Sequence, residues 1–281
     1  MTRKPAFEAA WFSVNLLLVL SFVLCIFGFA WEYSTRKYLQ GFSDAIIPAS
    51  SAPIERVETI LAWMSHGPAR RETPNPQGVS YRDPEETLNY QALLRVCGTA
   101  TNAFVNLANA SGVPARRLLL LDERLVAKHV VAEVRIDNQW IVVDPSYRVI
   151  PRGPDGGLLT RDDLANLDVF HYVFQNVPGY NPTLSYERTV HLRLARVPVF
   201  GRILRAILGR IAPRWEDSVY VTLLVERLSF TTTTASVLLF FILLLIRLGM
   251  RYYSEVSLGI HRIRFRERLW RAFQILLREP S

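Results

Sequence analysis

The chain has 281 residues, a formal net charge of +8 and a hydrophobic share of 50%. This length suits one ordinary domain plus additional segments, and the hydrophobic share is too low for a carrier with many membrane spans. The basic excess is concentrated in residues 247–281, which follow an apolar segment, so it indicates membrane topology and we expect no nucleic-acid partner. No CxxC, HExxH or phosphate-binding glycine loop occurs in the sequence, and we therefore expect neither a metal nor a cofactor.

Two uncharged apolar segments, residues 9–31 and 228–246, meet the roughly 20 residues that a helix needs to cross the hydrocarbon core. We predict a transmembrane helix in each, with the lipid bilayer as a partner. A buried core helix is the alternative for both segments. A cleaved signal peptide is a further alternative for the first, but its apolar stretch exceeds the usual h-region of about 7–15 residues.

The charges that flank the two segments predict the topology. Residues 1–8 carry a net charge of +1 and residues 247–281 carry +5, and an excess of Lys and Arg marks the cytoplasmic side. We therefore expect a cytoplasmic N-terminal tail, a basic cytoplasmic C-terminal tail, and an extracytoplasmic domain at residues 32–227 with its core at about 54–197. In a bacterium, this arrangement places the domain in the periplasm on the inner membrane.

Periodicity and turn residues predict the elements between the two spans. A helical connector follows the first span and ends near Pro48, and the next helix covers residues 54–65. A basic amphipathic helix is expected at residues 199–211, either on the outer membrane surface or as an ordinary surface helix. The remaining predictions are a helix at 97–111, strands at 117–121, 128–136, 140–143 and 190–197, and a helix capped by Thr160.

Cys97 begins one of these predicted helices. The only other cysteine, Cys25, lies in the first apolar segment, so Cys97 has no evident disulfide partner. Free N–H groups and the dipole at a helix N-terminus stabilise a thiolate, and the same N–H groups can receive an oxyanion. The alternative is an inert, buried structural cysteine.

His129 and Asp144 lie near facing ends of two predicted strands. A short hairpin at residues 137–139 joins these strands, so the two side chains come close together. Asp144 could bind one imidazole nitrogen and leave the other for Cys97, which is the arrangement of nucleophile, base and orienting carboxylate. Each residue alone has a plainer interpretation: a structural histidine, and a turn before Pro145.

Three blocks of sequence, taken together, resemble the transglutaminase-like (papain-like cysteine protease) superfamily. The family pattern is a cysteine on a helix with a Gly-Val-Pro-Ala-Arg exit, a His-x-x-x-Glu strand and Trp-x-x-x-Asp-Pro. Here these blocks are residues 97–116, 129–134 and 140–145, in order and at the usual spacing. The resemblance implies an α+β core in which the nucleophile helix packs on an antiparallel sheet, placed here between two transmembrane helices. It also implies that Cys97 is the nucleophile, His129 the base and Asp144 the orienting group.

One position departs from the family pattern, because Arg95 stands where a glycine is common two residues before the cysteine. The arginine could narrow the cleft, favour an acidic substrate or mark a site that has lost catalysis. The pattern does not fix the upstream oxyanion donor, for which Gln91, Tyr90 and Asn89 are candidates.

Two functions remain open from the sequence. The first is a membrane-anchored cysteine enzyme that acts on amide or peptide bonds of the cell envelope through a thioester, with hydrolysis favoured over transamidation. The second is a catalytically inactive binding or assembly subunit of a membrane complex for polysaccharide or cell-wall synthesis. Arginine makes up 30 of the 33 basic residues, which is compatible with a GC-rich bacterial genome.

Overall fold

The computed structural model describes residues 3–66, 83–88, 93, 96–192, 206, 209, 210, 212 and 215–256. Within these residues the chain forms two compact units. One contains the described residues of Met1–Phe27 and Thr233–Ser281, and the other is built from Gly28–Thr232.

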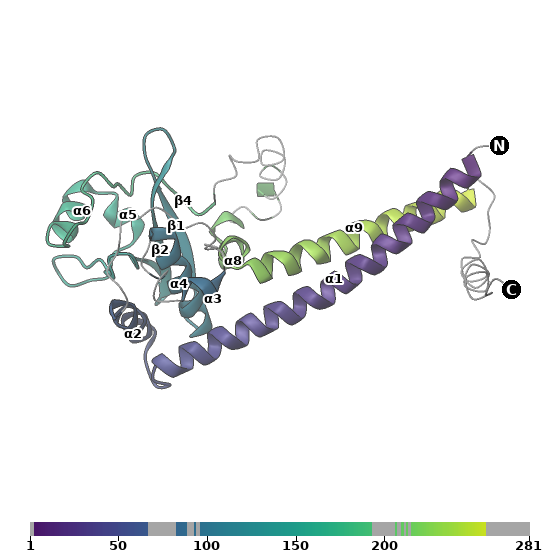
Figure 1. Ribbon diagram of the computed structural model, residues 1–281. Helices are drawn as coiled ribbons and strands as arrows, with labels where there is room; N and C mark the ends of the chain where they lie inside the picture. Colours follow the sequence, from purple (N-terminus) through teal and green to yellow (C-terminus); the bar gives the residue numbers. More distant parts are fainter. Residues whose placement is uncertain are drawn as a thin grey trace. The chain divides into compact units, whose positions relative to one another are not determined.

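Two helices are long and apolar enough to span a membrane: α1 (Arg3–Ile46) and α9 (Leu228–Val256) (Figure 1). Each contains a predicted apolar segment and continues beyond it. In the first unit, the Nε of Arg247 donates a hydrogen bond to the Oδ1 of Asn15 at 2.9 Å, and the rings of Phe22 and Phe240 lie 6.0 Å apart. These two helices suggest that the protein associates with a lipid bilayer.

The sheet of the second unit has four antiparallel strands in the order β3-β2-β1-β4. They are β1 (Ala115–Leu121), β2 (Ala127–Ile136), β3 (Gln139–Val143) and β4 (Thr189–Val190). The turn between β2 and β3 holds Asp137 at φ 45° and Asn138 at φ 67°. Positive φ at both positions matches the twist of a tight hairpin, which confirms the predicted turn. Of the predicted strand 190–197, residues 193–197 lie outside the described residues.

Helix α4 (Cys97–Ala110) packs on one face of the sheet, against β1 and β2 (Figure 1). Its apolar residues Ala100, Phe104, Leu107 and Ala108 are fully buried, and they share a core with residues of β2 and β3. The helix ends before Gly112, whose φ of 84° lies in the left-handed region that favours glycine. Helices α2 (Pro53–Ser65) and α3 (Pro84–Thr87) pack against α4 and complete this layer.

A second apolar cluster covers the opposite face of the sheet. It joins Leu118, Val131 and Val142 to aromatic residues of α6 (Leu167–Phe174) and the following loop. The Thr160 hydroxyl accepts a hydrogen bond from the Asp163 N–H and caps α5 (Arg161–Leu164), as the sequence predicts. A single turn of 3-10 helix, η2 (Trp215–Asp217), and helix α8 (Val219–Glu226) lead into α9. The architecture is therefore the expected α+β core, with a candidate membrane-spanning helix on each side of it in the sequence.

Candidate functional site

The hairpin of β2 and β3 brings His129 and Asp144 into direct contact. The imidazole Nε2 of His129 donates to the Oδ2 of Asp144 at 2.7 Å, and the side chains are 2% and 0% exposed. A register shift between Leu120 and Leu121 of β1 lies opposite this end of β2. Because Nε2 is occupied by the carboxylate, Nδ1 is the nitrogen left for a third group.

The Asp144 carboxylate is held by the backbone that follows β3. Its Oδ1 accepts the N–H of Ser146 at 3.0 Å and the N–H of Tyr147 at 3.3 Å. The backbone of Asp144 also exchanges two hydrogen bonds with Val149, which closes the turn. These contacts fix one carboxylate oxygen, so the other is directed at His129.

Cys97 is the first residue of α4 and is half-buried, at the position where N–H groups of the first turn have no partner within the helix. One turn later, the Thr101 hydroxyl donates to the carbonyl oxygen of Val130 at 3.0 Å. Val130 follows His129 in the chain. This bond therefore joins the helix that begins with Cys97 to the strand that carries His129.

The electrostatics of His129 favour the imidazolium. Burial by itself lowers the pKa of His129, but the hydrogen bond and charge of Asp144, together with those of Cys97, outweigh burial and raise the pKa to about 9. The influence between His129 and Cys97 is mutual, since a thiolate that stabilises the imidazolium is equally stabilised by it. The three residues can thus hold a thiolate–imidazolium pair at neutral pH.

Aromatic rings surround His129. The rings of Tyr147 and Tyr180 lie 5.8 Å and 6.3 Å from the imidazole, and Tyr180 stacks on Phe174 at 3.9 Å. Burial, followed by neighbouring charges that include Asp144, raises the pKa of Tyr180, so its hydroxyl stays neutral. The sequence gives no signal for this enclosure, because the rings come from residues 18 to 51 positions after His129. The rings around His129 exclude water and thereby strengthen its interaction with Asp144.

A cavity of about 370 Å³ adjoins these rings. It is lined by Phe170, His171 and Phe174 of α6 and by residues of the loop 175–182. Tyr180 belongs both to the wall of this cavity and to the aromatic surroundings of His129.

A second buried cluster of polar side chains is centred on Glu133, four residues after His129 in β2. The Oε2 of Glu133 accepts bonds from the Nε of Arg116 and the Nε2 of His191, each at 2.7 Å. His191 also contacts the Oδ1 of Asp217 at 3.0 Å through Nδ1, and the guanidinium of Arg116 lies 3.9 Å from the centre of the Trp140 ring. His191 therefore ties η2 to the sheet, which is a structural role.

The predicted oxyanion donors Asn89, Tyr90 and Gln91, and the unusual Arg95, lie outside the residues that the structure describes. Most of the predicted amphipathic helix at residues 199–211 lies outside them as well. Across the described residues, no group of three or more His, Cys, Asp or Glu side chains could hold a metal ion.

In a comparison with protein families, residues 40–145 match the family model described as the transglutaminase-like superfamily. The matched segment contains Cys97, His129 and Asp144. The search of curated proteins and the search of solved structures each gave no significant match.

Proposed function

We propose that the transglutaminase-like superfamily domain of this chain, matched at residues 40–145, works as a membrane-anchored cysteine enzyme on amide or peptide bonds of the cell envelope. In this proposal Cys97 is the nucleophile, His129 the general acid and base, and Asp144 the orienting carboxylate. The observation that carries the proposal is the buried 2.7 Å bond between His129 and Asp144, together with the raised pKa of His129. Hydrolysis is the simpler outcome, because water needs no second binding site.

The first half of the reaction forms a thioester. The Cys97 thiolate attacks the carbonyl carbon of the substrate, and an electron pair moves onto the carbonyl oxygen. When this intermediate collapses, the C–N bond breaks and the imidazolium of His129 gives a proton to the leaving amine. In this proposal the N–H groups of the first turn of α4 stabilise the negative oxygen.

The second half restores the enzyme. The neutral imidazole of His129 takes a proton from water, and the resulting hydroxide attacks the thioester carbon. The C–S bond then breaks, a carboxylic acid leaves, and the thiolate of Cys97 again faces an imidazolium. Asp144 holds the imidazole in one orientation through both halves and stabilises its positive charge without taking the proton.

We also propose that both termini are cytoplasmic and that the domain lies in the periplasm of a bacterial cell. The net charges of +1 on residues 1–8 and +5 on residues 247–281 support this orientation. Two candidate spans, α1 and α9, would return the chain to the side on which it starts.

The test uses the full-length protein in lipid nanodiscs with a panel of peptides and envelope amides. We expect turnover that is abolished by Cys97→Ala, and a covalent acyl adduct on Cys97 that mass spectrometry can detect. Cys25→Ala is the matched control and should keep full activity, because Cys25 lies in α1. A Cys97→Ala variant with unchanged activity on an identified substrate would contradict the proposal.

The alternative proposal is a catalytically inactive subunit that binds or assembles a membrane complex for polysaccharide or cell-wall synthesis. Arg95, in place of the glycine common in the family, supports this alternative, because a bulky cation next to the nucleophile could close the cleft. A folded protein whose Cys97 does not react with alkylating reagents at any pH would favour it.

A further inference from the structure

A buried polar cluster lies on the side of α4 opposite the thiol chemistry, and we call it the anchor cluster. It belongs entirely to the second compact unit. Its charged members Glu32, Glu226 and Arg227 are 4–5% exposed, and its amide members Asn102 and Asn106 are fully buried. Asn102 and Asn106 stand one turn apart on α4, so both face the same side of the helix.

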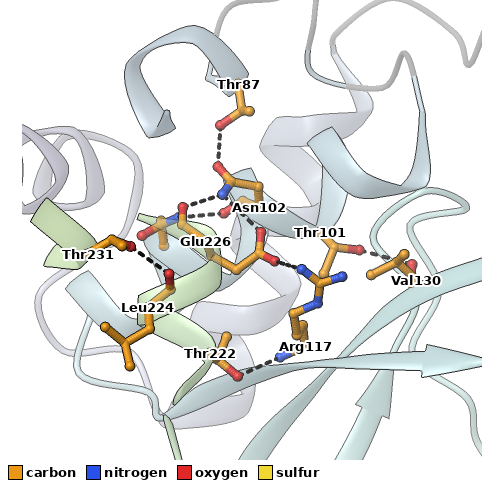
Figure 2. Close-up of polar contacts among 10 residues, drawn as sticks. Thr87, Thr101, Asn102, Arg117, Val130, Thr222, Leu224, Glu226 and Thr231 are labelled. Carbon is orange, nitrogen blue, oxygen red and sulfur yellow. Dashed lines mark hydrogen bonds and ion pairs between the residues drawn. The ribbon is translucent and has the colours of Figure 1, made fainter. Parts of the chain in front are cut away.

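Asn102 binds α4 to the segment that precedes the second candidate span (Figure 2). Its Nδ2 donates to the Oε2 of Glu226 at 2.9 Å and also to the backbone oxygen of Glu226. Its Oδ1 accepts from the hydroxyl of Thr87 in α3 at 2.6 Å. The other carboxylate oxygen of Glu226 pairs with Arg117 of β1, so Glu226 contacts both the helix and the sheet.

Asn106 extends the cluster to the first candidate span. Its Oδ1 accepts from the Nε of Arg227 at 3.0 Å, and the Nη1 of Arg227 donates to the Oε1 of Glu32 at 3.0 Å. The hydroxyl of Ser229 donates to the Oε2 of Glu32 at 2.7 Å. Glu32 belongs to α1 and Ser229 to α9, so the outer parts of both candidate spans converge on α4.

These hydrogen bonds are directional, and their main consequence is that they fix the position of α4. A buried ion pair contributes little net stability compared with apolar residues of the same volume, because both charges lose their hydration. Hydrogen bonds from two amides, however, permit only one position of the helix along its axis. On its other side, α4 is fixed to the His129 strand by the bond from Thr101 to Val130.

We propose that Asn102 and Glu226 are positioning residues for Cys97. They tie the helix that carries the nucleophile to the end of α8, directly before the second candidate span. The distance between the thiol and His129 then depends on the juxtamembrane segments and not on the matched family domain alone. This inference rests on the proposed function, because it concerns the thiolate–imidazolium pair.

The test measures the pH dependence of Cys97 alkylation in the full-length protein, in lipid nanodiscs, after size-exclusion chromatography has isolated folded protein. Asn102→Leu removes the amide hydrogen bonds and keeps the number and branching of the side-chain heavy atoms. The alkylation inflection is the pH at the midpoint of the curve of alkylation rate against pH. We expect it to rise by about one pH unit in this variant, which corresponds to roughly tenfold slower alkylation on the acid side of the inflection. Glu226→Gln should shift the inflection in the same direction by a smaller amount.

Asn109→Leu is the matched control. Asn109 lies on the same helix, and its amide binds the carbonyl oxygens of Val105 and Ala115, so these hydrogen bonds join α4 to the start of β1. Its loss should lower thermal stability and leave the inflection in place, because a loss of stability alone does not change the ionisation of folded molecules.

The outcomes separate this inference from the proposed function. The inference is overturned if the wild-type inflection is low and both Asn102→Leu and Glu226→Gln show the same low inflection. The Asn109→Leu control is expected to show it in any case. If Asn102→Leu yields no folded protein, Glu226→Gln decides the matter by itself. A wild-type thiol that titrates like a free cysteine, near pH 8.5, overturns the proposed function and the inference with it.

Discussion

Replacement of Asp144 by Asn changes the hydrogen-bond partner of His129 and leaves the surrounding turn in place. The amide keeps an oxygen for the N–H groups of Ser146 and Tyr147, so the turn after β3 is retained. It places an NH₂ group, however, against the Nε2 of His129, which now binds the carboxylate at 2.7 Å. The imidazole must then present an unprotonated Nε2, and the imidazolium loses the partner that stabilises it.

The expected magnitude follows from the pKa of His129, which the two neighbours raise to about 9 against burial. Relative to an ordinary histidine near 6.5, this shift corresponds to about 3 kcal/mol in favour of the folded state. Because the folded pKa is raised, the contribution is complete below about pH 6.5 and disappears as the pH rises through about 9. Asp144→Asn removes most of this stabilising contribution, and burial then lowers the pKa of His129.

The assay is an NMR titration of the imidazole signals in labelled full-length protein, which has five histidines. The His129 signal is assigned by comparison with a His129→Gln variant. We expect a midpoint near 9 in the wild type and a midpoint below 6.5 in Asp144→Asn, with turnover reduced on the order of a thousandfold or more. A midpoint near 9 in both proteins would show that Asp144 does not raise the pKa of His129.

Three further substitutions test other parts of the structure. Phe104→Ala empties a fully buried position of α4 and should lower the free energy of unfolding by about 3–5 kcal/mol in a denaturant titration; a loss below about 1 kcal/mol would contradict the packing described for this helix. Glu133→Gln breaks the buried contacts with Arg116 and His191 and should cost about 3–5 kcal/mol, while the alkylation inflection of Cys97 stays in place. Movement of that inflection would show that the two clusters on β2 are coupled. Thr101→Val removes the donor to the Val130 carbonyl and should cost about 1–3 kcal/mol and slow Cys97 alkylation at pH 7; unchanged alkylation would show that this bond does not hold the helix against the strand.

The local signals in the sequence were sufficient for the elements that carry the site. The apolar spacing after Cys97 and the glycine at position 112 predict α4, and Asp137 with Asn138 predicts the hairpin, because each depends on neighbouring residues only. The contact between His129 and Asp144 also follows, since a tight turn fixes which ends of two strands meet.

The anchor cluster could not be predicted in the same way. Asn102 and Glu226 are 124 positions apart, and a polar residue on a helix ordinarily faces water. The short helix α8 likewise lacks a strong pattern, because packing against β1 stabilises it. The continuation of α1 to Ile46, in contrast, agrees with the helical connector expected to end near Pro48. The spacing of Asn102 and Asn106 is a usable signal, because it puts two amides one turn apart on the same face of the helix.

The rate of Cys97 alkylation as a function of pH reports whether Cys97 and His129 form a working thiolate–imidazolium pair. The full-length wild-type protein is compared with His129→Ala. We predict an inflection well below the value of about 8.5 that a free cysteine shows, and its return to about 8.5 in the variant. An ordinary wild-type titration, or a low inflection that His129→Ala leaves unchanged, would show that the two residues do not form such a pair.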